Sequence, residues 1–413
     1  MTVTERTSSP RLLEGEVRIV GSRWSPRVHE LKAFLSRSRQ PYRWIEAEDR
    51  DRVVVHFPDG STLQDPAVRD VARKLGLEVE PESRTYDVIV VGGGPAGLTA
   101  AIHGAADGLR TIVVEQEVPG GQASYSALVE NYPGFPEGLS GSELARRTIQ
   151  QAERFGVEVL VTRRATGLRE EACKRVTLDE GTELASHAVL LALGVSFRWL
   201  EAPGCPQLVG AGVYYGAAIA EAAACRDQEV YVLGGGNSAG QAALLLAQFA
   251  RRVVILALEP TLEETMSRYL IDRIRSSGNI VVRTGCTVVA VEGDDHLEGL
   301  TIRDVRTGRT EQVRAQGLFI FIGATPRTDW LPDDVARDDR GFVLAGADLT
   351  CNGRVRAEWP LTREAYPLET SLPGVFVAGD VRRGSVKRMA SAAGEGSAAI
   401  QFIYRYLRAG KGA

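Results

Sequence analysis

Two glycine-rich turns in the chain have the spacing that phosphate binding requires. The first, Gly92-Gly-Gly-Pro-Ala-Gly97, follows the apolar run Val88–Val91 and precedes a helix predicted over 98–107. Its first glycine permits a tight turn, Gly94 lets backbone N–H groups approach a pyrophosphate, and Gly97 allows the helix to pack closely on the strand. The pattern predicts a strand, a turn and a helix whose amino end binds the phosphates of a dinucleotide.

A carboxylate follows where such a site needs a ribose contact. Glu115 ends a second predicted strand, Thr111–Val114, and lies 23 residues after Gly92. An acid at this point accepts hydrogen bonds from ribose hydroxyls. A glycine motif alone is weak evidence, because glycine turns are common. Here strand, turn, helix, second strand and acid all agree.

The second turn repeats this arrangement about 142 residues later. Gly234-Gly-Gly-Asn-Ser-Ala-Gly240 lies between a predicted strand, Glu229–Leu233, and a predicted helix over 241–250, with another strand at 252–256. The candidate nucleotide contacts are Gly234, Gly236, Asn237, Ser238, Ala239 and, after the last strand, Glu259. Two such units predict two nucleotide-binding domains of similar fold. A turn of this kind is able to hold pyrophosphate, but a vestigial second site fits the sequence too.

The composition is that of an ordinary globular chain. It has 413 residues, enough for about three domains, and 44% are hydrophobic and 25% charged. The formal net charge of -4 argues against a nucleic-acid or anionic-membrane partner. The polar segment 1–12 predicts no signal peptide, and no apolar run approaches the ~20 residues of a membrane span. We therefore expect a cytoplasmic protein.

The cysteines form no recognisable chemical group. They are Cys173, Cys205, Cys225, Cys286 and Cys351, with no CxxC pair and no zinc-type Cys/His spacing. This scattered set predicts reduced cysteines without a disulfide framework and no metal site.

Residues 1–80 are predicted to form a small α/β unit. A strand candidate at 17–20 precedes a helix that starts at Ser25-Pro26, and strand candidates follow at 42–47 and 53–57. A last helix is predicted over 67–75, and the charged stretch 78–84 is typical of a linker.

From about Tyr86 to Leu407 the chain resembles the low-molecular-weight thioredoxin reductase family of flavoproteins. Beyond the first turn, the resemblance is carried by Gly120-Gly-Gln122, Glu130–Pro136, Ala192-Leu-Gly194, Gly374–Asp380 and Arg388–Gly396. It implies FAD as a cofactor, NADH or NADPH as a second, and a homodimer. The FAD contacts it implies are Gly92, Gly94, Pro95, Ala96, Gly97, Glu115, Gln116, Gly121, Gln122, Asn131, Ala192, Gly194, Gly379, Asp380, Lys387, Arg388, Met389 and Ala390.

The resemblance also implies an α/β fold with two Rossmann-like three-layer domains. An FAD-binding domain would run over 84–203 and resume over 325–413, with an NAD(P)-binding domain inserted over 204–324. The front unit resembles a shortened thioredoxin or glutaredoxin-like domain. Its redox position reads Trp24-Ser-Pro-Arg-Val28 and holds no cysteine. Docking, dimerisation or a substrate lid are functional interpretations of this unit; a redox-silent packing domain is the structural one.

The chain departs from the family where the redox cysteine pair would lie. Aligning Gly212-Val-Tyr-Tyr215 places Gly216 and Ile219 at the two cysteine positions. Neither can attack or resolve a disulfide, because that exchange requires thiolates. Tyr214, Tyr215, Gly216 and Ile219 are therefore candidates for the substrate face of the flavin, with core packing as the alternative for the tyrosines. The nearest cysteine, Cys225, is interpreted as a small buried hydrophobe rather than a displaced redox partner.

A second departure concerns the nicotinamide cofactor. Where NADPH-preferring members carry His-Arg-Arg, this chain has Ala257, Leu258 and Glu259. Glu259 would repel a 2′-phosphate, which favours NADH, although Arg268 could partly compensate. Lys387-Arg388 either places positive charge at the flavin's pyrimidine edge or caps a surface turn.

Three functions fit these observations. NAD(P)H could reduce FAD, which passes electrons to a protein, quinone, small molecule or oxygen without an internal dithiol. Alternatively, a small metabolite could reduce FAD and oxygen reoxidise it, with a vestigial nicotinamide site. The third possibility is a flavin-dependent redox sensor.

Overall fold

The amino-terminal unit is a four-stranded sheet with two helices. The computed structural model describes residues 15–49, 52–126, 129, 131–216, 222, 225–351, 354–355 and 359–410. The strand order is β2-β1-β3-β4, with β1 and β2 parallel and the other pairs antiparallel. Its elements are β1 (Val17–Gly21), α1 (Pro26–Arg37), β2 (Tyr42–Glu46), β3 (Val54–His56), β4 (Thr62–Gln64) and α2 (Val68–Lys74). Helix α1 starts at a proline, whose fixed φ suits the first turn, and buries Val28, Leu31 and Leu35.

The second unit is built on a seven-stranded sheet that the chain leaves and later rejoins. Its order is β7-β6-β5-β10-β9-β8. Strand β23 pairs with the carboxyl end of β10, on the edge opposite β5. The parallel strands are β5 (Thr85–Val91), β6 (Thr111–Val114), β7 (Glu158–Leu160), β10 (Glu183–Leu191) and β23 (Val375–Val377); β8 (Ala165–Glu170) and β9 (Lys174–Leu178) are antiparallel. The helices are α3 (Pro95–Ala106), α4 (Gly141–Arg154) and α8 (Met389–Gly410).

Two hydrophobic clusters cover the two faces of this sheet. Val88 and Val90 of β5 pack with α3 and α8, whereas Ile89 and Val91 pack with β8, β9 and side chains within 331–345 and 372–381. Burial on both faces explains why the strand is a continuous apolar run rather than an alternating one.

The third unit repeats this layering. Its parallel sheet has the order β12-β19-β13-β14-β15, with strands β12 (Val213–Tyr215), β13 (Glu229–Leu233), β14 (Arg252–Ala257), β15 (Ile280–Thr284) and β19 (Leu318–Ile320). Helices α6 (Asn237–Leu246) and α7 (Arg268–Arg275) cover one face. The antiparallel strands β16 (Cys286–Glu292), β17 (Gly299–Asp304) and β18 (Thr310–Arg314) cover the other. The predicted α/β fold is confirmed.

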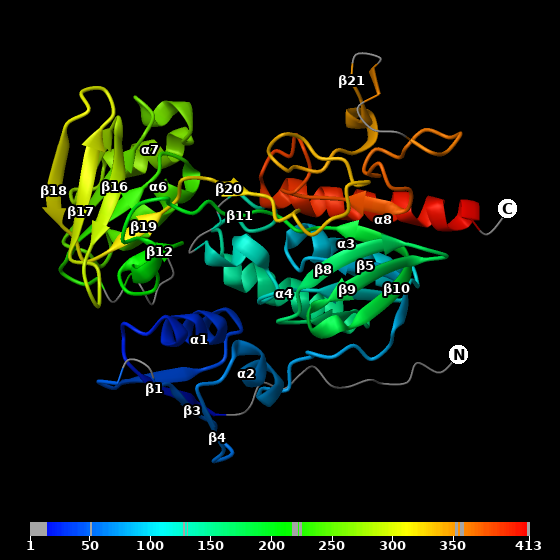
Figure 1. Ribbon diagram of the computed structural model, residues 1–413, viewed down its shortest axis with the longest axis horizontal. Helices are drawn as coiled ribbons and strands as arrows, with labels where there is room; N and C mark the ends of the chain where they lie inside the picture. The colour runs from blue at the N-terminus through cyan, green and yellow to red at the C-terminus, as the bar shows by residue number, and fades with distance from the viewer. Residues whose placement is uncertain are drawn as a thin grey trace.

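Two short ribbons complete the described elements. Strands β11 (Ser196–Phe197) and β20 (Ala324–Thr325) pair antiparallel where the chain passes between the second and third units (Figure 1). Strands β21 (Thr350–Cys351) and β22 (Arg354–Val355) form the other ribbon. None of the helices in the described ranges is long and apolar enough to cross a membrane.

Both fingerprint helices begin earlier than predicted. Helix α3 starts at Pro95 rather than 98, and α6 starts at Asn237 rather than 241. The last glycine of each motif therefore lies inside the first helical turn. The tight turn needs only the glycines before it, and Pro95 is well suited to the first helical position.

The amino-terminal unit contacts both of the larger units. Its Arg39 pairs with Glu143 of the second unit, and Val118 and Val161 of that unit join its core. On the other side, Trp24 stacks on His296 of the third unit with ring centroids 4.4 Å apart. Figure 1 shows α1 facing the region between the two larger units.

A buried arginine fastens the linker that follows the amino-terminal unit. Arg163 is fully buried, and its guanidinium donates to Val79 O (2.9 Å), Glu80 Oε2 (2.9 Å) and Asp179 Oδ1 (3.0 Å).

Removing the Arg163 guanidinium leaves a buried carbonyl and two acids without this donor. We expect Arg163→Ala to lower the free energy of unfolding by about 3 kcal/mol in urea denaturation. Arg169→Ala, which removes an exposed ion pair, should cost less than about 1 kcal/mol. Equal losses for the two variants would contradict this assignment.

Candidate dinucleotide site

The first glycine turn is closely packed on one side and open on the other. A Cβ at Gly97 would lie 1.9 Å from the Gly92 carbonyl oxygen, and one at Gly92 would lie 2.2 Å from the Ala192 carbonyl oxygen. By contrast, a Cβ at Gly94 would have no atom within 4 Å. Gly94 is the N-cap of α3, where the first N–H groups of a helix lack intrahelical partners. The open side therefore presents backbone donors to space that a phosphate can fill.

Glu115 closes this turn from the end of β6. Gly93 N–H donates to Glu115 Oε2 (2.7 Å), and Glu117 N–H donates to Glu115 Oε1 (2.8 Å). Only 7% of the residue is exposed, and this burial raises the pKa of the carboxyl group. Each carboxylate oxygen can accept a further hydrogen bond, so the predicted ribose contact remains open to it.

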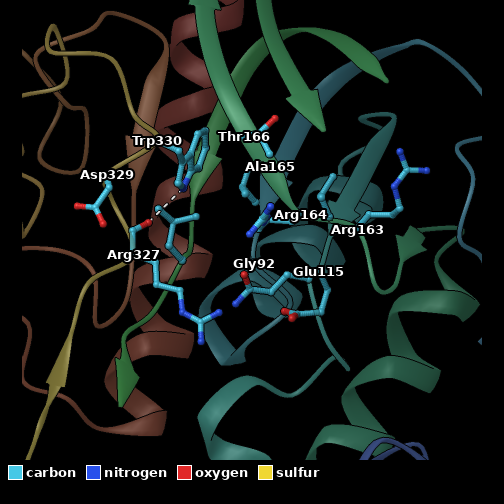
Figure 2. A pocket seen from close by; sticks show the side chains of 13 residues that line it. Gly92, Glu115, Arg163, Arg164, Ala165, Thr166, Arg327, Asp329 and Trp330 are labelled. Carbon is cyan, nitrogen blue, oxygen red and sulfur yellow. Dashed lines mark hydrogen bonds between the residues drawn. The ribbon is translucent and has the colours of Figure 1, made fainter. Parts of the chain in front are cut away.

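Two cavities meet at Glu115. One, of about 410 Å³, extends from Gly92 and Glu115 past Arg164 and Arg327 to Trp330 (Figure 2). The Trp330 ring is held by its Nε1–H, which donates to Arg327 O (3.1 Å). The other, of about 270 Å³, runs along the amino end of α3. Together they form an elongated space with an acid near its middle.

Most of the predicted flavin contacts line the second cavity. These are Gly92, Gly94, Pro95, Ala96, Glu115, Gln116, Gly121, Gln122, Asn131, Ala192, Gly194, Gly379, Asp380, Lys387, Arg388 and Met389. Gly97 and Ala390 are absent from the lining. Gly97 instead lets α3 pack on the turn, and Ala390 is exposed on α8. Contact of each residue with FAD stays a prediction.

The segment before α8 brings Asp380 to the cavity. Gly379 has a φ of +78°, and its N–H donates to Glu395 Oε2 (2.8 Å) in α8. Burial raises the pKa of Asp380, while the nearby Lys387 ammonium, which donates to Asp380 O (3.3 Å), opposes that rise. Sequence reasoning found Asp380 but missed Glu395, which also binds Arg382 and so fixes the turn.

The second glycine turn has the same open side. A Cβ at Gly234 would lie 2.3 Å from Phe321 O, whereas the nearest atom to one at Gly236 is Thr265 O at 4.0 Å. Asn237 Oδ1 accepts a hydrogen bond from Ser267 N–H (2.7 Å), which ties this turn to the start of α7. Its side-chain oxygen therefore serves the fold, and Gly236 is the part that is open to a ligand.

Glu259 differs from its counterpart Glu115. It lies just beyond β14, and a Cβ on Gly235 would be 2.5 Å from its Oε2 atom. That oxygen is buried and has no hydrogen-bond partner in the described part of the chain. A buried carboxylate oxygen without a donor is costly, so it marks a place where a ligand hydroxyl would fit.

The first glycine turn and the amino end of α6 line one cavity, whereas Gly234, Gly236, Ala239 and Glu259 are absent from its lining. Asn237, Ser238 and Gln241 of α6, with Tyr269 of α7, line the same 270 Å³ space as Gly94. Gln241 follows Asn237 by one helical turn, so helical periodicity could have found it. Arg37, Tyr269 and Arg327 also line this cavity, but they lie outside the motifs and no pattern in the sequence marked them.

The residues at the expected dithiol position are packed elsewhere. The Tyr214 ring stacks on Phe319 (5.2 Å) and contacts His29 (5.4 Å). Tyr215 Oη accepts from Leu200 N–H (2.8 Å). Neither tyrosine is in the lining of the 270 Å³ cavity, which matches the core-packing interpretation. Gly216 has a φ of +112°, and Ile219 lies outside the described residues.

The cysteines and acids form no further reactive group in the parts of the chain that the structure describes. Cys225 is 4% exposed in the core of the third unit and takes part in no disulfide, as is true of Cys173, Cys205 and Cys286. Across the same residues, no cluster of His, Cys, Asp or Glu could hold a metal ion.

Comparison with known proteins gives consistent matches over most of the chain. The model of the pyridine nucleotide-disulphide oxidoreductase family matches residues 86–396. Thioredoxin reductase of Mycolicibacterium smegmatis is 35% identical over 322 residues, which cover 78% of this chain and 96% of that protein. An alkyl hydroperoxide reductase protein of Staphylococcus aureus is 32% identical over 346 residues, covering 82% of this chain but only 63% of that protein.

A solved structure shares the arrangement of the two larger units. Lactococcus lactis thioredoxin reductase in its FR conformation aligns with a TM-score of 0.69 at 30% sequence identity. The alignment covers 78% of this chain and 98% of that one. The amino-terminal unit lies before the start of the family match.

The open side of the first turn can be tested with one methyl group. Gly94→Ala has a φ of -77° and no protein atom near its new Cβ, so it should fold normally. The methyl group enters the cavity, and we expect FAD to bind at least about 10-fold more weakly. Titration of the flavin-free protein measures this, with Gly278→Ala, another uncrowded site, as control. Unchanged FAD affinity in Gly94→Ala would contradict the assignment of this turn to FAD binding.

Proposed function

Because the chain belongs to the pyridine nucleotide-disulphide oxidoreductase family, we propose that it carries electrons from NADH through FAD to an acceptor outside the chain, without an internal dithiol. The observation that carries this proposal is the single cavity that both the first glycine turn and the amino end of α6 line. A reduced nicotinamide must approach a flavin closely for hydride transfer. A cavity shared by the two nucleotide-binding units supports such an approach without a relay between the cofactors.

The residues fit the two cofactors of the family. The chain is a flavoprotein oxidoreductase whose cofactors are FAD and NADH or NADPH. The uncrowded Gly94 and Gly236 each leave room for a pyrophosphate, and Glu115 and the unpartnered Glu259 oxygen each offer an acceptor to a ribose. FAD supplies the redox chemistry, because it accepts a hydride and can release its electrons singly or in pairs.

In this proposal the residues of the chain bind and orient the two dinucleotides. The amino ends of α3 and α6 hold pyrophosphates through backbone N–H groups. Glu115 and Glu259 would hold riboses, and the cavity lined by Trp330 would take the adenosine of FAD. At the other end, Lys387 lines the cavity beside Asp380 and adds positive charge, which favours an anionic reduced flavin.

The missing dithiol restricts the acceptor. Gly216 and Ile219 replace the two cysteines in our alignment, and the described cysteines nearest to them are buried. Electrons would then leave directly from the flavin to a small molecule, a quinone, oxygen or a redox protein. The alkyl hydroperoxide and thioredoxin activities in the relatives' names belong to those proteins. A homodimer stays a prediction from the family resemblance, and a cytoplasmic location stays a prediction from the sequence.

Stopped-flow mixing without oxygen tests the proposal. We expect NADH to bleach the flavin absorbance rapidly in the native protein. Gly236→Ala should lower the affinity for NADH by about 10-fold while FAD remains bound, because only the second turn is altered. Gly278→Ala is again the control.

Other outcomes identify the alternative functions. No bleaching by NADH or NADPH, with turnover of a metabolite and oxygen, would indicate an oxidase with a vestigial nicotinamide site. Slow reduction that changes partner binding would indicate a redox sensor. Either result overturns the proposal.

The choice between NADH and NADPH depends on Glu259. Its buried, unpartnered oxygen can accept from a 2′-hydroxyl but would repel a 2′-phosphate. We expect Glu259→Arg to raise the ratio of kcat/KM for NADPH to that for NADH by at least about 10-fold, because a guanidinium binds phosphate. Glu263→Ala, which removes a nearby exposed acid paired with Arg275, should leave the ratio unchanged. An unaltered ratio in Glu259→Arg contradicts this role.

A further inference from the structure

Arg37, the last residue of α1, extends from the amino-terminal unit and lines the 270 Å³ cavity. The Arg37 side chain is 10% exposed. Its Nη1 donates to Glu117 Oε2 (2.8 Å), its Nη2 to Val118 O (3.0 Å) and its Nε to Ser124 Oγ (3.2 Å). All three sides of the guanidinium are therefore used on one segment of the second unit. A lysine could not make this set of contacts, because its ammonium is a single point of charge.

One partner of Arg37, Glu117, is hydrogen-bonded to the acid of the first glycine turn, and another, Ser124, is bonded within the segment that contacts the turn. Glu117 N–H donates to Glu115 Oε1 (2.8 Å), and Ser124 Oγ donates to Gly121 O (2.8 Å). Within this segment, Gly120 N–H donates to Gly93 O (2.7 Å). Segment 117–124 thus lies against the turn, and Arg37 holds it there from outside.

Segment 117–124 also packs against the amino-terminal unit. Val118, which is 5% exposed, belongs to the hydrophobic core of that unit rather than to either core of the second unit. A Cβ at Gly121 would lie 3.1 Å from Gly94 Cα, so the segment approaches the turn closely at a residue without a side chain. The amino-terminal unit therefore sets one wall of the cavity.

The charges around Glu115 come from both signs of side chain. Burial, the largest cause, raises the pKa of the Glu115 carboxyl group, and the Glu117 carboxylate raises it as well, whereas the Arg37 guanidinium opposes the rise. Arg327 approaches Glu117 from the other side, with its Nη1 3.7 Å from Glu117 Oε1, so Glu117 lies between two guanidinium groups. The two guanidinium groups hold the Glu117 carboxylate in place beside the buried acid.

We propose that Arg37 is a positioning residue for the adenosine diphosphate half of FAD, so that the amino-terminal unit forms part of the flavin site. The unit has no cysteine at the redox position of its fold, and this role does not require one. Arg37 acts through Glu117, Val118 and Ser124 on the wall next to Gly94 and Glu115. The family resemblance would place the isoalloxazine half beside Asp380 and Lys387, whereas Arg37 binds the segment next to Gly94 and Glu115.

Flavin titration of the flavin-free full chain tests this role. We expect Arg37→Ala to raise the dissociation constant for FAD by at least about 10-fold, and Arg37→Lys to recover only part of the loss. The matched control is Arg39→Ala. It removes a pair from the same interface, but Glu143 keeps Arg146 and Arg147 and the cavity lining is untouched.

FMN separates positioning from a general loosening of the structure. It lacks the adenosine half, so its dissociation constant should change less than about 2-fold in Arg37→Ala. Melting of the flavin-free variants checks that Arg37→Ala and Arg39→Ala are equally folded. The proposal fails if FAD binds Arg37→Ala with native affinity, if FAD and FMN weaken equally, or if Arg39→Ala loses as much FAD affinity as Arg37→Ala.

Discussion

The close approach of two helices to one glycine turn is the constraint on which the site depends. Gly97 brings α3 onto the carbonyl of Gly92, and a Cβ at Gly396 of α8 would lie 2.1 Å from the Ala96 carbonyl oxygen. Because both contacts are backbone to backbone, no larger side chain fits at either position. The amino ends of two helices from opposite ends of the second unit therefore converge on the same cavity, where their unpaired N–H groups favour an anion.

The parts of this site that the sequence could predict are those governed by local rules. Val88–Val91 is a continuous apolar run because β5 is covered on both faces, and Gly92, Gly94 and Gly97 follow from the geometry of a tight turn. The first residues of α3 and α6 were placed too late, because the motifs do not separate the turn from the first helical turn.

The parts that the sequence could not predict are contacts between distant segments. Glu395 fixes the Gly379 turn, Trp330 closes the end of one cavity, and Arg37 comes from a different unit. An arginine at the end of a surface helix is ordinary in sequence, and only tertiary packing gives it a role. Equally, the sequence left Tyr214 open between a flavin contact and core packing, and only the fold shows that its ring packs on Phe319 and His29.

The stacking of Trp24 on His296 has a consequence for motion between the larger units. The second and third units are joined by the β11–β20 ribbon, and the amino-terminal unit contacts both. If the amino-terminal unit stays on the second unit, rotation of the third unit about that ribbon separates Trp24 from His296 and His29 from Tyr214. Ring pairs of this kind contribute roughly 1 kcal/mol each beyond their buried area. The two pairs together add a barrier of roughly three to four times RT. Such a barrier slows reorientation of the third unit without preventing it.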